Sequence, residues 1–246
     1  ARPVGGPGWY LDRPGFWPAY LIDRLSRLEI VLLTALILGG LADALGIFVL
    51  QLPVYSGAGG SHSLSYDAAQ RLSFAHFAGN LAFLQTIALD SWGSNGPLWS
   101  LANEFWYYIW FPALILLVRK RRLSWGLLGL VVGLISPAIL VGFASWLAGF
   151  GLLLLVGRLP LADQESNVAR LIRFAVATAV FLAVLAISGL WKRSELDVPL
   201  AVTFGWFLFE LARARLPFPV MLLPLALFGS GSSFSLYVIH FPLIAL

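Results

Sequence analysis

Long apolar runs separated by short polar segments make up most of the chain. A membrane-spanning helix needs about 20 apolar residues, or fewer where protein covers a short helix. Runs that meet this condition cover residues 28–51, 98–118, 124–139, 143–158, 171–190, 198–212, 216–229 and 233–246. The runs are continuous rather than alternating, which favours helices over a β-barrel. The sequence therefore predicts an all-α, polytopic integral membrane bundle of about eight spans.

The break within the uncharged stretch 124–158 is set by its turn-forming residues. Pro137 and Gly142, in "ISPAILVG", favour an interruption there. Two helices, 124–139 and 143–158, are therefore expected rather than one.

Composition supports the membrane class. Of the 246 residues, 59% are hydrophobic and 11% are charged, whereas soluble domains carry about 25% charged residues. Mean hydropathy is +0.85. The chain has no cysteine, so disulfides and thiolate chemistry are excluded. His62, His76 and His240 are far apart and lack the spacing of metal ligands, so no metal site is predicted.

Basic residues orient the predicted spans. They occur in short groups, "DRLSR" (23–27), "RKRR" (119–122) and "RAR" (213–215), as in cytoplasmic loops beside membrane spans. Residues 1–27 are then a cytoplasmic juxtamembrane segment, and the loop 53–70 lies outside. No basic face remains for nucleic acid, which is excluded as a partner; the lipid bilayer is the expected one.

A weaker apolar segment, residues 72–89, starts and ends outside in this scheme. It is about 18 residues long and contains polar side chains such as Asn80 and Gln85. A re-entrant or protein-buried segment fits both facts, because polar or irregular backbone is tolerated where protein covers it. The alternative is that residues 72–89 form an ordinary span, and that one loop does not follow the rule that basic loops lie in the cytoplasm.

A glutamate interrupts the aromatic segment "NGPLWSLANEFWYYIWFP" (95–112). Inserting the Glu104 carboxylate into a bilayer costs a few kcal/mol, so it needs a partner or a task. Helix rise places it about 10 Å below the outer end of its span. One hypothesis is a hydrogen bond to Tyr or Asn that joins two helices; the other is a catalytic role.

Two histidines are predicted at a similar depth. His240, in "SFSLYVIHFPLI", is again about 10 Å below an outer helix end, and His76 lies near the outer face. Together with Glu104 they are candidates for acid–base catalysis, because imidazole titrates near neutrality and a carboxylate can orient it. The alternative for each histidine is a hydrogen-bonded core residue.

Two further charged sites lie in the first span region. Arg24 and Arg27 share one helix face, and either anchor the helix at the cytoplasmic side or bind phosphates through paired guanidinium groups. Asp43, in "GGLADALGIF", either faces a cavity or pairs with an arginine, and no partner can be assigned to it from the sequence.

Three segments of the chain resemble the membrane acyltransferase family 3. "YLIDRLSRLEIVLL" (20–33) is similar to the R-x-x-R segment of that family, with Asp23 where a further arginine is usual. Residues 80–112 resemble its asparagine/leucine segment followed by W-S-L-x-x-E, and "SFSLYVIHFPLI" (233–244) resembles its closing S-Y-S-L-Y-L-x-H-x-P. Family members are integral-membrane O-acyltransferases that modify surface polysaccharides, lipopolysaccharide O-antigens, nodulation factors and some antibiotics.

The resemblance implies an enzyme that moves an acetyl or short acyl group from acyl-CoA to a carbohydrate hydroxyl, in a bacterial inner membrane. It implies donor binding by Arg24 and Arg27 and catalysis involving Glu104, with His240 and His76 as further candidates. The matched residues that could bind substrate are Trp99, Ser100, Asn80 and Tyr107.

The start of the chain departs from the family pattern, which opens with an earlier helix carrying an arginine and a catalytic histidine. No such helix precedes residue 20, residues 1–23 do not resemble a signal peptide, and the last apolar run ends early. We therefore expect a single acyltransferase domain over 1–246 that is a fragment of a longer chain. His240 belongs to another motif and does not replace the missing histidine.

Two rival functions stay open. A proton-coupled transporter or flippase would use Glu104, His240 and Asp43 as a proton relay, although paired interrupted helices are not evident in the sequence. An inactive structural remnant is the other alternative.

Overall fold

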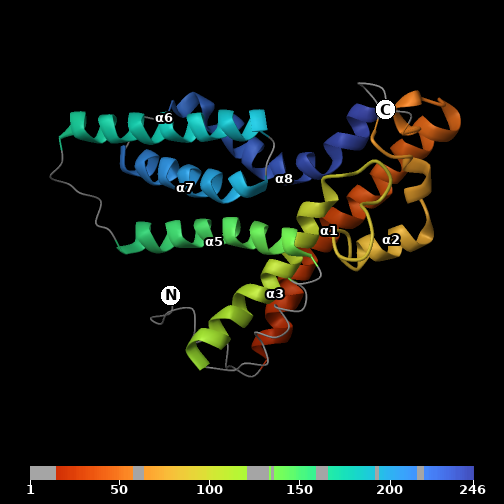
Figure 1. Cartoon of the computed structure of the whole chain (residues 1–246), viewed down its shortest axis with the longest axis horizontal. Helices are drawn as coiled ribbons and strands as arrows, with labels where there is room; N and C mark the ends of the chain where they lie inside the picture. Colours follow the sequence, from red (N-terminus) through yellow and green to blue (C-terminus); the bar gives the residue numbers. More distant parts are fainter. Residues whose placement is uncertain are drawn as a thin grey trace. The chain divides into compact units, whose positions relative to one another are not determined.

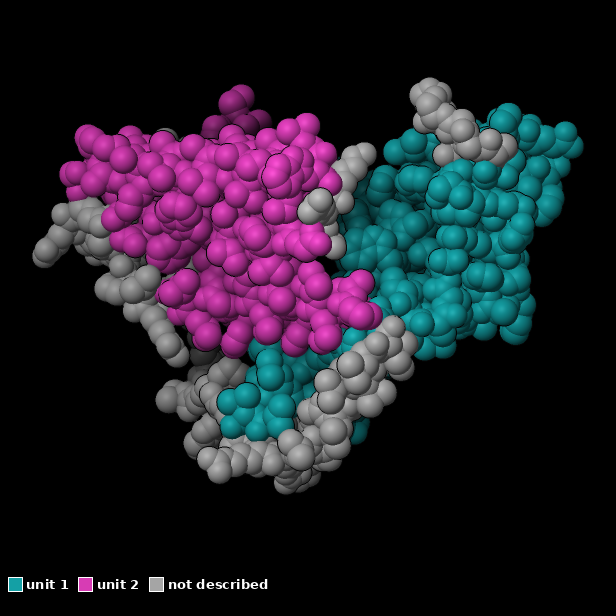
Figure 2. Space-filling model, in the orientation of Figure 1, with its two compact units in different colours: residues 1–136, 224–246 teal, residues 137–223 magenta. Residues whose placement is uncertain are grey.

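The fold is known from a computed structural model, which describes residues 15–57, 64–120, 133, 136–158, 166–191, 194–214 and 219–246. These residues form seven α-helices joined by short 3₁₀ turns, with a π-helical turn after the first helix (Figure 1). The predicted all-α class is confirmed. The chain divides into two compact units, residues 1–136 with 224–246 and residues 137–223 (Figure 2).

Four elements of the first unit surround its core. They are α1 (Phe16–Ala44), α2 (Phe74–Leu81), α3 (Leu98–Lys120) and α8 (Leu223–Ala245). Leucines spaced four apart on α1 share one helix face and form the centre of this core. The buried cluster contains Leu28, Leu32, Leu36, Phe83, Leu98, Leu101 and Val238.

Three contacts fix the directions of these helices. Tyr20 Oη, near the start of α1, donates a hydrogen bond to the carbonyl of Tyr108, near the middle of α3. Trp92 Nε1, just before α3, donates to the carbonyl of Leu36, so α1 and α3 are antiparallel. A Cβ on Gly39 would lie 3.2 Å from Cγ of Pro242. Together with the packing of Val238, this makes α8 parallel to α1.

The second unit is a three-helix layer. It contains α5 (Pro137–Arg158), α6 (Asn167–Trp191) and α7 (Asp197–Ala214), with α7 packed against both neighbours (Figure 1). Aromatic rings join α6 to α7, with centroids 5.8 Å apart for Phe174–Phe207 and 5.2 Å for Phe181–Phe204. The later residue on α6, Phe181, pairs with the earlier residue on α7, Phe204, so α6 and α7 are antiparallel.

Four helical stretches in the described part of the chain are long and apolar enough to cross a bilayer. They are Pro18–Val49, Pro137–Leu155, Asn167–Trp191 and Val220–Ala245. The predicted integral, multi-pass class therefore holds, but the described residues show four candidate spans rather than eight. Predicted spans 98–118 and 198–212 are helical as expected without joining this group, and α7 contains three charged residues.

Two predicted helix boundaries are wrong. Residues 223–245, which include parts of predicted spans 216–229 and 233–246, form one helix, α8. Ser232 and Ser233, near the predicted break, donate their hydroxyls to the carbonyls of Phe228 and Ser230 within the helix. Helix α1 begins at Phe16, twelve residues before the predicted span, so "DRLSR" is helical rather than a loop.

The predicted break at "ISPAILVG" occurs earlier than Gly142. Helix α5 begins at Pro137, because proline suits the first turn of a helix, where its missing N–H is not needed. Most of predicted span 124–139 lies outside the described residues.

Residues 72–89 do not form a spanning helix. Only the eight residues of α2 are helical, about 12 Å of rise, and turns follow with positive φ at Phe83 and Thr86. Asn80 and Gln85 are fully buried here. The ordinary-span alternative is therefore wrong, and the irregular backbone is of the kind that protein must cover.

Candidate functional site

An arginine stacks on two tyrosines where α1 and α3 meet. Cζ of Arg24 lies 5.6 Å from the ring centroid of Tyr20 on its own helix and 5.2 Å from that of Tyr108 on α3. Cation–π contacts at such distances are favourable, more so when they are shielded from water. The hydrogen bond from Tyr20 to the Tyr108 carbonyl, 2.8 Å long, holds the rings in place.

The Glu104 carboxylate contacts the hydroxyl group of the same tyrosine. Its Oε1 accepts a hydrogen bond from Tyr108 Oη, four residues on along α3, where helix geometry brings side chains together. The side chain of Tyr108 thus contacts both the Arg24 guanidinium, at its ring, and the Glu104 carboxylate, at its hydroxyl. The prediction that placed these two charges at opposite membrane faces is wrong, because α1 extends further at its N-terminal end than the apolar pattern shows and Arg24 reaches the middle of α3.

Asp23 lies beside both candidate donor-binding arginines. Its carboxylate is 3.8 Å from Arg24 Nε and 3.4 Å from Arg27 Nη2. The Arg27 side chain is 68% exposed, so this ion pair is weak, and the guanidinium group can exchange Asp23 for another anion. Arg24, held between aromatic rings, is the better fixed of the two.

Neither candidate histidine joins Glu104 in the part of the chain that the structure describes. His76 bonds the hydroxyl of Ser73 through Nδ1, and His240 Nδ1 lies against the carbonyl of Tyr237. His240 is next to the α1–α8 contact at Gly39, which is about 22 Å along α1 from Arg24. The predicted three-residue acid–base group is therefore not formed among these residues.

Asn80, a predicted substrate-binding residue, organises the chain between α2 and α3. Its buried amide donates to the carbonyls of His76 and Asp90, at 2.9 and 3.0 Å, and accepts from the Trp92 N–H at 3.1 Å. Few hydrogen-bonding positions remain on this side chain. The contacts fit a structural role.

Replacing Asn80 with alanine is expected to destabilise the protein by about 2–3 kcal/mol, because buried backbone groups lose their partners. Thermal unfolding in detergent, followed by tryptophan fluorescence, measures this. The matched control is Gln70→Ala, which removes one exposed hydrogen bond to Asp67 and should change stability by less than about 0.5 kcal/mol. An unchanged melting temperature with a raised KM for acceptor would instead support substrate binding.

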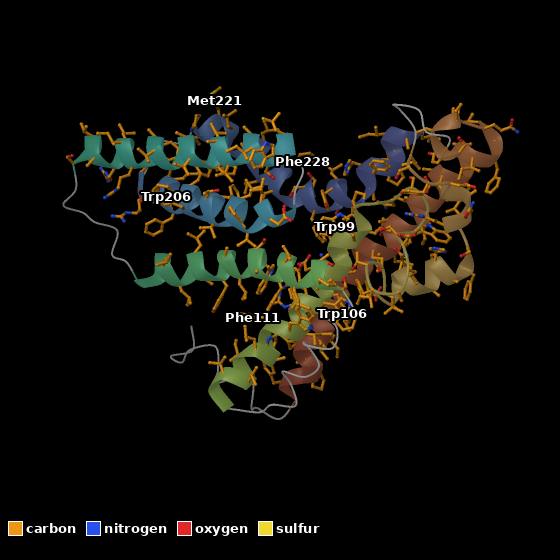
Figure 3. The ribbon with its side chains drawn as sticks, viewed as in Figure 1. Trp99, Trp106, Phe111, Trp206, Met221 and Phe228 are labelled. Carbon is orange, nitrogen blue, oxygen red and sulfur yellow. The ribbon has the colours of Figure 1, made fainter. Side chains whose placement is uncertain are left out.

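The other predicted substrate-binding residues lie along the first three turns of α3 and differ in accessibility. Trp99 is 48% exposed, and it lies on α3 with Trp106 and Phe111 (Figure 3). Ser100 donates to the carbonyl of Pro97, and Tyr107 is buried. Of the predicted set, Trp99 is thus the side chain most accessible to a ligand.

Asp43 has a partner that the sequence did not identify. Its carboxylate accepts from the backbone N–H of Ser94 at 2.7 Å and from the Ser94 hydroxyl at 2.6 Å, and the side chain is fully buried. Gly93 has φ +56°, and a Cβ there would lie 2.0 Å from Oδ2. Burial, with a contribution from Asp43, raises the pKa of the neighbouring Tyr55 to about 12. Asp43 therefore fixes the turn before α3.

A hydrogen bond from a tyrosine to Glu104 was one of the predictions, but the contact of that tyrosine, Tyr108, with Arg24 was missed. The contact between Arg24 and Tyr108 spans 84 positions of the chain, and periodicity within one helix cannot reveal it.

In the described part of the chain, no group of three or more His, Asp or Glu side chains is suited to hold a metal ion. His62 lies outside it.

Comparison with known proteins decides the family. Residues 8–246 match acyltransferase family 3, described as an acyltransferase domain. The chain belongs to acyltransferase family 3. The predicted family is confirmed, and with it the predicted acyltransferase activity of a membrane enzyme. No curated protein and no solved structure gives a significant match. The acyltransferase match includes the Arg24, Tyr108 and Glu104 positions.

Proposed function

We propose that this acyltransferase moves an acetyl or short acyl group from acyl-CoA to a hydroxyl of a cell-surface carbohydrate, at a site built around Tyr108. The observation that carries the proposal is that Tyr108 contacts both the Arg24 guanidinium and the Glu104 carboxylate. A group that attracts phosphate and a group that handles a proton therefore lie within reach of one bound donor.

Arg24 would bind the anionic part of the donor. Guanidinium groups recognise phosphate oxygens through paired hydrogen bonds, and Arg24 Nε is buried without a hydrogen-bond partner among the described residues. Stacking on two rings fixes its orientation. Arg27 lies one turn further along α1 and is exposed. It would add a second positive charge to the donor site once the phosphate replaces Asp23 as its partner.

Glu104 would act on the acceptor side of the reaction. Tyr108 engages Oε1, which leaves Oε2 to orient the acceptor hydroxyl or the histidine that the family resemblance implies as base. As the base removes its proton, the hydroxyl oxygen forms an ester bond to the acyl carbon. The carbon–sulfur bond breaks, and the thiolate of coenzyme A takes up a proton.

Trp99 would contact the acceptor. It is exposed and lies five residues before Glu104 on α3. An exposed indole offers a sugar ring an apolar face together with an N–H donor. The acceptor class rests on this side chain and on the family, and a bacterial inner membrane is the proposed location.

The transporter alternative receives little support from the geometry. Both Asp43 oxygens bond Ser94, and Asp43 is about 28 Å along α1 from Arg24, whose partner ring holds Glu104. Glu104 and Asp43 are therefore too far apart to pass a proton directly.

The experiment that tests the function uses acetyl-CoA labelled in the acetyl group with protein purified in lipid nanodiscs. Transfer of label to a carbohydrate acceptor, or release as acetate without one, supports the proposal. Proton-coupled flux in proteoliposomes without consumption of donor would replace it with the transporter.

Replacing Arg24 with glutamine is expected to raise the KM for acetyl-CoA about tenfold or more, because one charge-assisted phosphate contact is lost. The kcat should fall much less, since Glu104 is unchanged. Initial rates against donor concentration measure both. Lys192→Gln, which removes the same charge from the sequence just after α6, is the matched control. A fall in kcat at unchanged KM would remove Arg24 from donor binding.

A further inference from the structure

An acidic side chain lies next to both arginines of the proposed donor site. The Asp23 carboxylate is 3.8 Å from Arg24 Nε and 3.4 Å from Arg27 Nη2. Only the second contact is a hydrogen bond. Arg24 Nε is attracted by Asp23 without being bonded to it, and has no hydrogen-bond partner among the described residues. One carboxylate therefore acts on both guanidinium groups that a donor phosphate would contact.

The ion pairs of Asp23 contribute little to the fold. Asp23, Arg24 and Arg27 all belong to α1, so these pairs do not join one helix to another. The side chains of Asp23 and Arg27 are 53% and 68% exposed, and exposed pairs four residues apart stabilise a helix only slightly. Helix α1 is held by its buried leucines and by the contacts of Tyr20 and Arg24 with α3. Stability therefore does not account for a carboxylate at this position.

A carboxylate beside guanidinium groups weakens their binding of any other anion. Carboxylate and phosphate oxygens use the same N–H donors, so Asp23 and a phosphate compete for Arg27. Arg24 is fixed by stacking on Tyr20 and Tyr108, and a phosphate bound to it would lie close to the Asp23 charge. Competition and repulsion both lower the affinity for the anion, and the repulsion increases with the charge of the ligand.

We propose that Asp23 sets the affinity of the donor site by competing with the phosphates of coenzyme A for Arg24 and Arg27. This inference rests on the proposed function and adds a residue that weakens donor binding. The acetyl-CoA donor and the coenzyme A product carry the same phosphates, so a site that bound them too tightly would retain the product. Product release limits kcat in many enzymes. Asp23 weakens both complexes, and coenzyme A can therefore leave before the next donor binds.

Replacing Asp23 with asparagine removes the charge and keeps the size of the side chain. We expect Asp23→Asn protein to bind coenzyme A about three- to tenfold more tightly, because a negative charge close to several phosphate charges is lost. The gain should be smaller for 3′-dephospho-coenzyme A, which lacks a phosphate monoester with a charge of about −2. An ion pair that only positions the arginines predicts the opposite, since its loss would weaken the binding of both ligands.

Steady-state kinetics give a second measurement that a structural role would not change in this direction. In Asp23→Asn protein, the KM for acetyl-CoA and the inhibition constant of coenzyme A should fall together, because both depend on the same phosphate contacts. The KM for the acceptor should not follow them. A fall in the KM for the donor without stronger inhibition by the product would contradict the inference.

The deciding experiment measures binding by calorimetry, with the purified protein in phosphatidylcholine nanodiscs and with coenzyme A or its 3′-dephospho form as the probe. Two control variants accompany Asp23→Asn. Asp23→Glu keeps the charge one helical turn from Arg27, so its affinity should stay within about twofold of that of the unsubstituted protein. Glu195→Gln removes the same charge from an exposed position in the second unit and should leave binding unchanged.

The possible results separate this inference from the proposed function. Melting temperatures without ligand should be nearly equal in all four proteins, which shows that the variants fold. Unchanged or weaker binding of coenzyme A by Asp23→Asn overturns the inference. If the unsubstituted protein transfers acetyl groups in that case, the proposed function stands. If none of the proteins binds coenzyme A or transfers label, the proposed function fails and the inference fails with it.

Discussion

Replacing Glu104 with glutamine is expected to abolish acyl transfer while leaving the protein at normal abundance in the membrane. Glutamine keeps the size of the side chain and an oxygen that can accept the Tyr108 hydroxyl. It removes the negative charge that would orient a base or bind a hydroxyl proton. Loss of a group that assists proton transfer in the transition state lowers the rate by a factor of about 10²–10⁴. The amount of labelled acetate on carbohydrate measures acyl transfer, and immunoblots of membranes measure the abundance of the protein.

A comparison with Tyr108→Phe separates chemistry from positioning. Removing the phenol hydroxyl frees Glu104 Oε1 and leaves the ring under Arg24. We expect a smaller loss of about tenfold, because only one hydrogen bond is removed. Glu104→Gln protein that retains full transfer would exclude this carboxylate from the reaction.

Asp43→Ala is expected to cause the largest loss of stability of any substitution considered. The carboxylate accepts two short bonds from Ser94 in a fully buried site. Its removal leaves a buried N–H and a buried hydroxyl without partners, at a cost of about 3–5 kcal/mol. For a chain of this size the melting temperature should fall by roughly 10 °C, measured by tryptophan fluorescence in detergent.

The matched control for Asp43 is Asp23→Ala on the same helix. Asp23 is half-exposed and its ion pairs are with exposed or partly exposed arginines, so the change in stability should stay below about 1 kcal/mol. Gly93→Ala should destabilise in the same direction as Asp43→Ala, since its Cβ would meet the carboxylate. Equal melting temperatures for the two aspartate variants would mean that the turn at Ser94 is held by other contacts.

The apolar pattern predicted which parts of the chain are helical better than where helices end. Runs of hydrophobic residues identified α3, α6 and α7 because each of these helices contains one whole run. Helix α1 was predicted too short, since its first turns contain the charges of "DRLSR", and charge in a membrane protein was taken to mark a loop. Helix α8 was predicted as two spans with a break at residues 230–232, but the chain stays helical there, since serine hydroxyls can bond within a helix.

The candidate site was predicted residue by residue but not as an arrangement. Glu104 and Arg24 were identified from the cost of a membrane-embedded carboxylate and from helix spacing. Their meeting at Tyr108 depends on the antiparallel register of α1 and α3, which is set by packing and by Trp92. The histidines were grouped with Glu104 on depth alone, and depth does not show which helix faces another. The partner of Asp43 is a serine 51 positions away.

The two ends of the α1–α3 pair are fastened unequally. Toward the Asp43 end, the helices are joined through short bonds in a fully buried turn. At the Arg24 end, the contacts include ring faces and the hydrogen bond from the Tyr20 hydroxyl to the Tyr108 carbonyl, beside the partly exposed guanidinium group. We therefore expect separation of the two helices to begin beside Arg24, and the proposed acyl donor to enter there without disturbing the Asp43 half.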